Sequence, residues 1–272
     1  MSWFTRTGAS SSKPAARRGE GLWPSNTLYA FEQALALGVD LLEIDIQTTA
    51  DGVLVVRHDP TVDSTTDGTS LIRDYSLNEL KKLDAGHTWT ADGGTTFPYR
   101  GRGITIPTLE EVFAAFPNAR LNIDVKPKEP QVVRRFCELL NDLHKLDQVI
   151  VGSFHDNQIA LFRRLCPQVL TAAGVAETRR FLLLNNLNLA RLYRPPAFAF
   201  QVPETVAGGF IPRSLHVVTP RFIRSAHAHG LQVHVWTVNE TADMQRLVAW
   251  GVDGIMTDYP DRLAAVLTSS RG

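Results

Sequence analysis

The sequence has no excess of either charge. It contains 28 lysines and arginines and 28 aspartates and glutamates, so its formal net charge is zero. Nucleic-acid-binding domains draw much of their affinity from a basic surface, and acidic or basic tails generally mark a charged partner. The balanced composition therefore gives no support for a nucleic-acid partner.

Long hydrophobic runs are also missing. A helix that crosses a membrane needs about 20 consecutive apolar residues, and no run in this chain approaches that length. Residues 1–18 lack the apolar core of a signal peptide. We therefore expect no membrane span and a cytoplasmic location.

Cysteine is scarce, with only Cys137 and Cys166 in 272 residues. Both lie in helix-like segments and lack the paired spacing of a zinc site. Disulfide frameworks belong mainly to small secreted domains with many cysteines. We therefore expect neither a disulfide framework nor a zinc site, which suits a reducing compartment. The length instead fits one large domain with its own core.

What the chain does contain is an alternation of apolar strand-like runs with helical periodicity. This alternation predicts a parallel sheet, and at this length it favours a closed TIM-type (β/α)8 barrel over an open sheet. No glycine-rich nucleotide loop supports the open alternative. Nine runs are strand-like, which is more than a barrel needs, so one or two of 53–56, 169–173 and 215–218 should be peripheral. The other six are 41–46, 121–125, 149–153, 197–202, 233–237 and 254–257.

Two segments depart from this alternation. Residues 1–18 are small, polar and basic, so we expect poor order there and a first strand that is atypical or missing. Residues 19–272 should form a single barrel domain. Within it, a stretch near 60–105 is rich in aspartate, glycine and threonine and is too long for an ordinary connection. Such an insertion usually acts as a lid or substrate loop.

Two carboxylates share one face of the run 41–46. Because side chains alternate along a strand, Glu43 and Asp45 point one way and their apolar neighbours the other. Two like charges on a buried face need compensation, and a divalent cation is the simplest source. His58 ends the next run, where an imidazole could act as an acid or base. The alternative is a solvated polar face on an edge strand, with His58 in a turn.

Other strand ends carry polar side chains as well. Asp124 and Lys126 share a face, so one could bind a metal and the other an anion, or they could form an ion pair. Trp236 could be a wall of a substrate site or core filling. Asp258 could belong to the same rim or cap a helix. A TIM barrel builds its active site at the carboxyl ends of its strands, so we expect this rim to carry the chemistry.

Several of these motifs occur together and in a fixed order. They are PSNTLYAFEQALALGVDLLEIDIQTTADGVLVVRHD (24–59), DVK (124–126), SF (153–154), VWTVN (235–239) and GIMTDYPD (254–261). In this the chain resembles the glycerophosphodiester phosphodiesterase family, whose members are barrels like phosphatidylinositol phospholipase C. The resemblance implies hydrolysis of a small-molecule glycerophosphodiester to sn-glycerol 3-phosphate and an alcohol, with calcium or magnesium as the cofactor.

The resemblance also assigns roles to residues by their position in these motifs. Three acids match the metal ligands, a histidine matches a catalytic group, two basic residues neutralise the phosphate and take part in catalysis, and a tryptophan forms a wall of the substrate site. They are, in that order, Glu43, Asp45 and Asp124; His58; Arg17 and Lys126; and Trp236.

The chain departs from the family pattern upstream of these motifs. The family begins with a strand that ends in His-Arg-Gly, eight residues before the proline that matches Pro24. Counting back eight residues places Ala16 on the histidine and Arg17 on the arginine, whereas a shift of one residue places Arg17 on the histidine. Neither registration supplies an imidazole. The resemblance therefore implies impaired activity, with an inactive phosphodiester-binding or structural relative as the alternative.

Two smaller departures are substitutions at single positions within the motifs. The family usually has glutamate where this chain has Asp124, and aspartate presents a carboxylate on a shorter arm. Ser25 stands in place of the usual glutamate of the Pro-Glu-Asn-Thr motif, at a position that we interpret as structural.

Overall fold

The computed structural model describes residues 13–17, 21–208 and 211–269, and within them parallel strands close into a barrel. The strands are β1 (Lys13–Arg17), β2 (Leu41–Thr48), β4 (Leu121–Val125), β5 (Val149–Gly152), β6 (Leu170–Thr171), β7 (Ala199–Pro203), β10 (Gln232–Trp236) and β11 (Gly254–Thr257). Their order is β6-β5-β4-β2-β1-β11-β10-β7. The two ends meet at a parallel bridge between Ala172 and Ala199, where the Phe198 amide donates to the Thr171 carbonyl at 2.8 Å. The predicted TIM-type barrel is confirmed.

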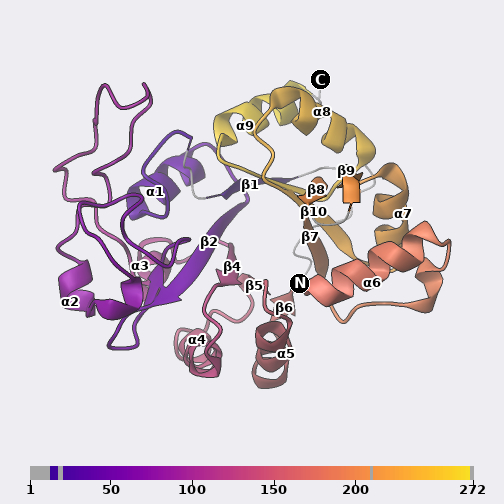
Figure 1. Ribbon diagram of the computed structural model, residues 1–272, viewed down its shortest axis with the longest axis horizontal. Helices are drawn as coiled ribbons and strands as arrows, with labels where there is room; N and C mark the ends of the chain where they lie inside the picture. Colours follow the sequence, from indigo (N-terminus) through magenta and orange to yellow (C-terminus); the bar gives the residue numbers. More distant parts are fainter. Residues whose placement is uncertain (1–12, 18–20, 209–210, 270–272) are drawn as a thin grey trace.

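Helices surround this barrel in Figure 1. They are α1 (Leu28–Ala36), α3 (Leu109–Ala115), α4 (Pro130–Asp142), α5 (Asp156–Leu165), α6 (Val175–Asn186), α7 (Pro220–Ala228), α8 (Thr241–Trp250) and α9 (Pro260–Ser269). Several begin at threonines whose side chains accept a backbone hydrogen bond, such as Thr27 from Ala30 and Thr108 from Glu111. These caps satisfy amide groups that the first helical turn leaves unpaired.

The apolar core lies between the barrel and its helices. Along β2, Leu42, Ile44 and Ile46 are fully buried and pack against α1 and the helices that follow β4 and β5. A second cluster joins the outer faces of β7, β10 and β11 to α6, α7, α8 and α9. Because the apolar residues of each strand face outward to the helices, the alternate positions face the barrel interior.

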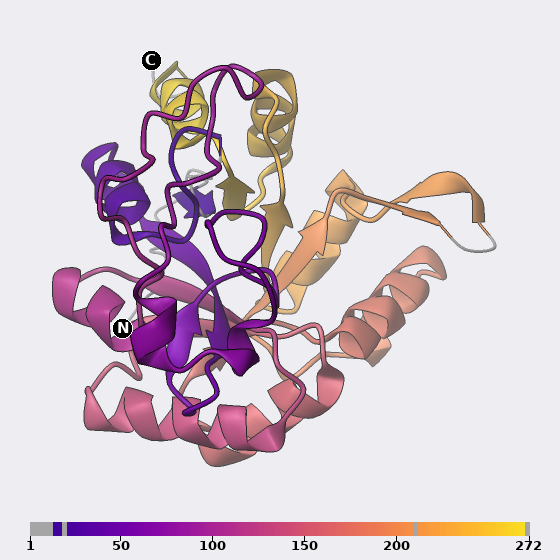
Figure 2. The same cartoon turned by 60° about the vertical axis from the view of Figure 1, so that its left-hand side comes forward.

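Three strands lie outside the parallel barrel. β3 (Leu54–Val56) pairs antiparallel with β2. β8 (Thr205–Gly208) and β9 (Ile211–His216) form an antiparallel hairpin after β7, which extends beyond the barrel in Figure 2. Two of the three runs predicted to be peripheral, 53–56 and 215–218, are thus confirmed. The third, 169–173, supplies β6 and belongs to the barrel.

The segment between β3 and α3 contains a short 3-10 helix, η1 (Ile72–Asp74), and one turn of α-helix, α2 (Leu77–Leu80). A small apolar cluster holds it together, formed by Val55, Val62, Ile72, Leu80, Ala85 and Ile106. A further 3-10 helix, η2 (Ala190–Leu192), follows α6.

The first strand confirms one half of an expectation and corrects the other. The sequence predicted a strand that is atypical or missing, and β1 is present and pairs in parallel with both β11 and β2. Its sequence, Lys-Pro-Ala-Ala-Arg, is atypical, but neighbours on both sides supply backbone partners that do not depend on an apolar pattern. The expectation for residues 1–12 and 18 lies outside the described residues.

The cysteines correct a second expectation. Cys137 of α4 and Cys166 at the end of α5 form a disulfide, with Cα atoms 6.1 Å apart. The two cysteines are 29 positions apart, which spans one repeat of helix, strand and helix, so neighbouring helices bring the two side chains together. Among the described residues, no helix is long and apolar enough to cross a membrane.

Candidate active site

The predicted carboxylates lie at the carboxyl ends of two neighbouring strands. Glu43 and Asp45 occupy the inner face of β2, opposite the outward core positions. β4 runs beside β2 in a register that pairs Asp45 with Asp124 and Glu43 with Asn122. Asp45 is fully buried and Asp124 is 8% exposed. The structure therefore brings the three acids together on one inner face.

Lys126 lies between two of these acids. Its ammonium is 2.9 Å from Oδ1 of Asp45 and 2.5 Å from Oδ2 of Asp124. Burial alone would lower the pKa of Lys126, but the charges of Asp124 and Asp45 outweigh burial and raise it. The side chain is therefore a firmly charged cation at the end of β4. The structure thus has an ion pair between Asp124 and Lys126.

His58 follows β3 and is held in orientation by a hydrogen-bond network. Its Nδ1 lies 2.7 Å from Oδ1 of Asp59, and its carbonyl accepts from Gln47 Nε2 at 3.0 Å. The Ser64 hydroxyl donates to the other oxygen of Asp59 at 2.6 Å. Burial would raise the pKa of Asp59, but the hydrogen bonds from Ser64 and His58 and the charge of Arg57 lower it overall.

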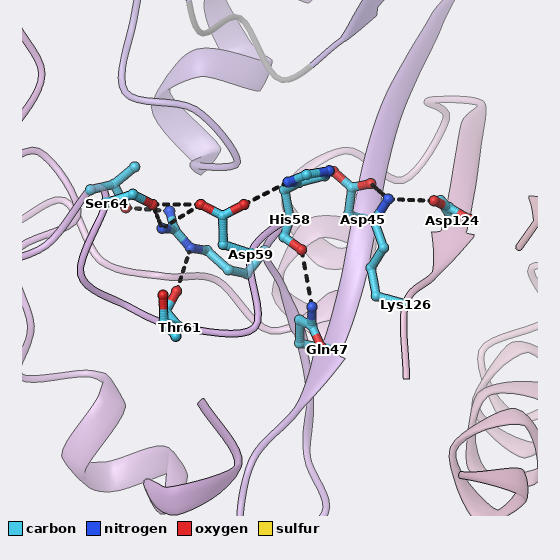
Figure 3. A network of polar contacts seen from close by, with 10 residues as sticks. Asp45, Gln47, His58, Asp59, Thr61, Ser64, Asp124 and Lys126 are labelled. Carbon is cyan, nitrogen blue, oxygen red and sulfur yellow. Dashed lines mark hydrogen bonds and ion pairs between the residues drawn. The ribbon is translucent and has the colours of Figure 1, made fainter. Parts of the chain in front are cut away.

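This network determines which nitrogen of His58 is available for chemistry. An ionised carboxylate only accepts hydrogen bonds, so Nδ1 carries the hydrogen that points at Asp59. Nε2 is then free of that contact. Figure 3 shows the ring between Asp59 and Asp45, with Lys126 and Asp124 beyond. Sequence reasoning gave Asp59 no orienting role, although its place directly after His58 was a signal.

Trp236 ends β10 and faces an aromatic neighbour that the sequence reasoning did not single out. Its ring centroid is 5.7 Å from that of Phe154, in an edge-to-face arrangement. The Lys126 ammonium is 5.2 Å from the centroid of the Phe154 ring. The SF pair after β5 was the only signal for Phe154. Together the two rings form an aromatic wall beside the cation.

A cavity of about 730 Å³ opens at this rim. Glu43, Asp124, Lys126 and Trp236 all contribute to its lining. This volume lies in the range of about 300–1,000 Å³ that is usual for small-molecule sites. The cavity therefore joins the acids, the cation and the aromatic wall in one space.

The backbone register distinguishes the two possible positions of the missing histidine. Ala16 pairs with Leu42, which belongs to the outer face of β2, and Arg17 pairs with Glu43, which belongs to the inner face. Paired residues of parallel neighbours lie on the same face of a sheet. Position 17 is therefore level with the inner face of β2, and position 16 is level with its outer face.

The three acids at the rim offer possible ligands for a divalent cation. Glu43, Asp45 and Asp124 offer only carboxylate oxygens, which calcium and magnesium prefer. Within the part of the chain that the structure describes, no three acidic, histidine or cysteine groups converge at metal-binding distance. The Lys126 ammonium instead supplies the compensating charge between Asp45 and Asp124. The three acids therefore fit a hard cation in the type of donor that they offer, while Lys126 occupies the space between two of them.

A sequence profile of the glycerophosphoryl diester phosphodiesterase family matches residues 17–262. The chain belongs to this family. It is therefore a phosphodiester hydrolase, as its motifs suggested. A glycerophosphodiester phosphodiesterase of Bacillus altitudinis is 32% identical over 259 residues, which cover 92% of this chain and 96% of that protein.

Solved structures of the family share the fold. A glycerophosphoryl diester phosphodiesterase domain from Mycobacterium tuberculosis superposes with a TM-score of 0.82 at 25% identity, covering 96% of this chain and all of that one. A phosphodiesterase of Oleispira antarctica, solved with the product sn-glycerol-3-phosphate, gives a TM-score of 0.75 at 24% identity. That match covers 94% of this chain and 96% of the other.

Proposed function

We propose that the protein hydrolyses glycerophosphodiesters to sn-glycerol 3-phosphate and an alcohol. The observation that carries this proposal is the Lys126 cation, which lies at the barrel rim beside two buried acids and within the cavity. Phosphoryl transfer needs positive charge on the phosphate oxygens and a group that moves a proton. Lys126 supplies the charge, and Nε2 of His58, oriented through Asp59, moves the proton.

The metal dependence is part of the same proposal. Glu43, Asp45 and Asp124 would hold the divalent cation, calcium or magnesium, which would supply positive charge to a phosphate oxygen when bound. Binding to the folded state should raise the melting temperature by mass action. Glu43→Gln should abolish the shift caused by calcium or magnesium, while Glu110→Gln, in the first turn of α3, should retain it. An unchanged shift in Glu43→Gln would refute this ligand assignment.

We further propose that this chain is less active than members of the family that have the histidine. Arg17 stands level with Glu43, at a position where an imidazole would serve as the second acid or base. Losing one such partner typically costs a factor of about 100 to 10,000 in rate. The same loss favours the alternative of a phosphodiester-binding relative without turnover. Release of glycerol 3-phosphate from glycerophosphocholine, measured with added calcium or magnesium and with a chelator, separates the two.

A matched pair of lysine variants tests the proposal at its centre. Lys126→Met removes the cation between the acids, and Lys128→Met removes an exposed lysine two residues later. We expect turnover of glycerophosphocholine to fall by a factor of at least about 100 in Lys126→Met and to be unchanged in Lys128→Met. Wild-type turnover in Lys126→Met would overturn the assignment.

The cytoplasmic location is still only a prediction. The disulfide between Cys137 and Cys166 counts against it, because disulfides persist mainly in oxidising compartments. Alkylation of free thiols in freshly lysed cells, followed by mass spectrometry of the two cysteine peptides, would show whether the bond is present there.

A further inference from the structure

Exposed leucines gather at one place on the surface, at the end of α6 and in the η2 segment that follows it. Seven large apolar side chains are exposed among those that the structure describes, and four of the seven lie between positions 183 and 192. They are Leu183, Leu187, Leu189 and Leu192, with exposed fractions of 60%, 57%, 37% and 66%. A single exposed leucine is ordinary, but a cluster marks a surface that binds something apolar.

The helix α4 shows how the outer face of a barrel helix usually looks. After its first residue, its exposed positions are all polar: Gln131, Arg134, Arg135, Glu138, Asn141 and Asp142. α6 buries Phe181 against Phe200 of β7, but it also exposes Leu183 and, one turn later, its C-cap residue Leu187. Residues four apart lie on the same side of a helix. α6 therefore has a second apolar stripe, which faces solvent.

The same stretch is strongly basic. Residues 178–194 contain four arginines and no aspartate or glutamate, although the chain as a whole has no net charge. All four arginines are exposed, at positions Arg179, Arg180, Arg191 and Arg194. Exposed leucines among basic residues are typical of a surface that lies on an anionic lipid bilayer. We call these four arginines and the four exposed leucines the leucine–arginine patch.

Contacts within the protein hold this patch in place. The Arg180 guanidinium lies 4.3 Å from the centre of the Tyr193 ring, which ties α6 to the chain after η2. Arg221 of α7 donates to the Asn185 carbonyl and to Asn188 Oδ1, the latter at 2.7 Å. A surface that is already ordered loses little conformational entropy when it binds.

A second copy of this chain is a poorer occupant of the patch than a bilayer. In a two-fold dimer the same patch lies on both partners. Such an interface would bring the arginines of the two patches together, and residues 178–194 offer no acid to pair with them. Phospholipid phosphates, in contrast, accept charge-assisted hydrogen bonds from guanidinium groups.

We propose that the leucine–arginine patch docks the protein on the surface of an anionic lipid bilayer. The leucines enter the boundary between head groups and acyl chains, and the arginines contact lipid phosphates at the level of the head groups. Docking of this kind does not require a membrane-spanning helix. The inference does not rest on the proposed hydrolysis, because it concerns a surface and names no substrate.

Binding to vesicles of defined composition is the first test. Each basic residue close to an anionic surface strengthens binding about fivefold. We therefore expect the wild type to co-sediment with vesicles of equal parts phosphatidylcholine and phosphatidylglycerol at least about tenfold more strongly than with phosphatidylcholine alone. Added salt should weaken this binding. No binding to the anionic vesicles, or equal binding to both kinds, would overturn the proposal.

Two leucines in equivalent positions supply the matched variants for the apolar part. Leu187 and Leu37 are the C-cap residues of α6 and α1, so an aspartate meets the same helix dipole and changes the net charge equally in both. Leu37 is 41% exposed, and Figure 1 shows α1 and α6 on opposite sides of the barrel. Leu187→Asp should weaken binding to the anionic vesicles at least about tenfold, and Leu37→Asp should bind like the wild type. Equal binding by the two variants would refute the patch.

A second pair of variants tests the charge without touching the leucines. Arg191→Gln should weaken binding about fivefold, whereas Arg134→Gln, on the outer face of α4, should leave it unchanged. Equal losses in both would mean that only the net charge matters, which would overturn the assignment to this patch.

Sedimentation velocity without lipid tests the other occupant. We expect the wild type and Leu187→Asp to sediment as the same species. If the wild type is a dimer and Leu187→Asp a monomer, the leucines form an interface between two copies of the chain, and the proposal is wrong.

Discussion

The two halves of the barrel interior differ in charge. On the inner face of β2 and β4, Glu43, Asp45 and Asp124 are ionisable and Lys126 lies among them. On the inner face of β7 and β10, the corresponding groups are Gln201, a buried histidine and Trp236. The first half concentrates charge where an anionic group would bind. The second half lines its part of the cavity with uncharged side chains.

Neutrality of the second half is maintained by burial and hydrogen bonds. Gln201 donates to Asn122 Oδ1 at 2.6 Å, and His234 Nε2 lies 3.0 Å from Gln232 Oε1. Burial lowers the pKa of His234 to about 4, so this ring is neutral at neutral pH. The comparison teaches that one barrel can hold ion pairs on one wall while burial and hydrogen bonds keep another wall neutral.

The largest effect should come from the charged half. His58→Asn removes the proposed acid or base and should lower kcat for glycerophosphocholine by a factor of about 100 to 10,000. His227 offers a matched control, because its Nε2 lies 2.7 Å from Asp253 Oδ2, a contact as short as that between His58 and Asp59. His227→Asn should retain wild-type kcat. If kcat falls equally in both variants, the His58–Asp59 pair supports the folded structure and does not take part in the chemistry.

Sequence reasoning located the charged half better than the second half, for physical reasons. Strand alternation is local, so the shared face of Glu43 and Asp45 followed from the chain itself. The position of Lys126 between Asp45 and Asp124 depends on the register between two strands, which a single run does not reveal. The neutral pair Gln201 and His234 carries no pattern that separates it from ordinary strand residues.

Features that depend on distant partners were predicted least well. β1 forms because β11 and β2 flank it, although Lys-Pro-Ala-Ala-Arg has no strand pattern. The bond between Cys137 and Cys166 depends on the packing of α4 against α5. Barrel closure at Ala172 and Ala199 involves only one bridge, so the short β6 could not be told from a peripheral run.

The disulfide on the charged half should contribute the next largest effect. It closes a loop of 29 residues, for which chain entropy gives a stabilisation of about 3.6 kcal/mol. Cys137→Ser should lower the free energy of unfolding by about that amount in urea titrations. The reduced wild-type protein is the control and should match the variant. Equal free energies of unfolding for the oxidised wild type and Cys137→Ser would show that the disulfide does not stabilise the folded protein.

A smaller effect should come from the neutral half, through pH. The pKa of His234 is about 4 in the folded protein and about 6.5 in the unfolded chain. Between these values the unfolded chain binds a proton that the folded protein excludes, so stability should fall as the pH falls from 6.5 to 4, by at most about 3 kcal/mol. Above pH 6.5 this contribution should be constant.

His234→Gln removes the titrating group and should flatten that part of the stability profile. His216 is exposed, so His216→Gln should leave the profile unchanged. Urea titrations at half-unit intervals of pH would measure both. If His234→Gln keeps the wild-type profile, other groups cause the loss of stability at acidic pH. The burial of His234 is then not what keeps the second half of the barrel neutral.

The smallest expected change adds a group to the charged half. Position 17 is level with Glu43, whereas position 16 is level with the outward Leu42. Arg17→His should therefore place an imidazole at the height of the acids and raise kcat for glycerophosphocholine by about tenfold, the low end of what one acid or base supplies. KM should rise as well, because a permanent positive charge is lost.

Ala16→His is the control for this register. It introduces the same side chain one residue earlier, level with the outward Leu42, so it should leave kcat unchanged or lower the melting temperature. A gain in Ala16→His without one in Arg17→His would reverse the assignment and restore the count of eight residues back from Pro24. No gain in either variant would show that a single imidazole does not limit turnover, and the low activity proposed for this chain would need another cause.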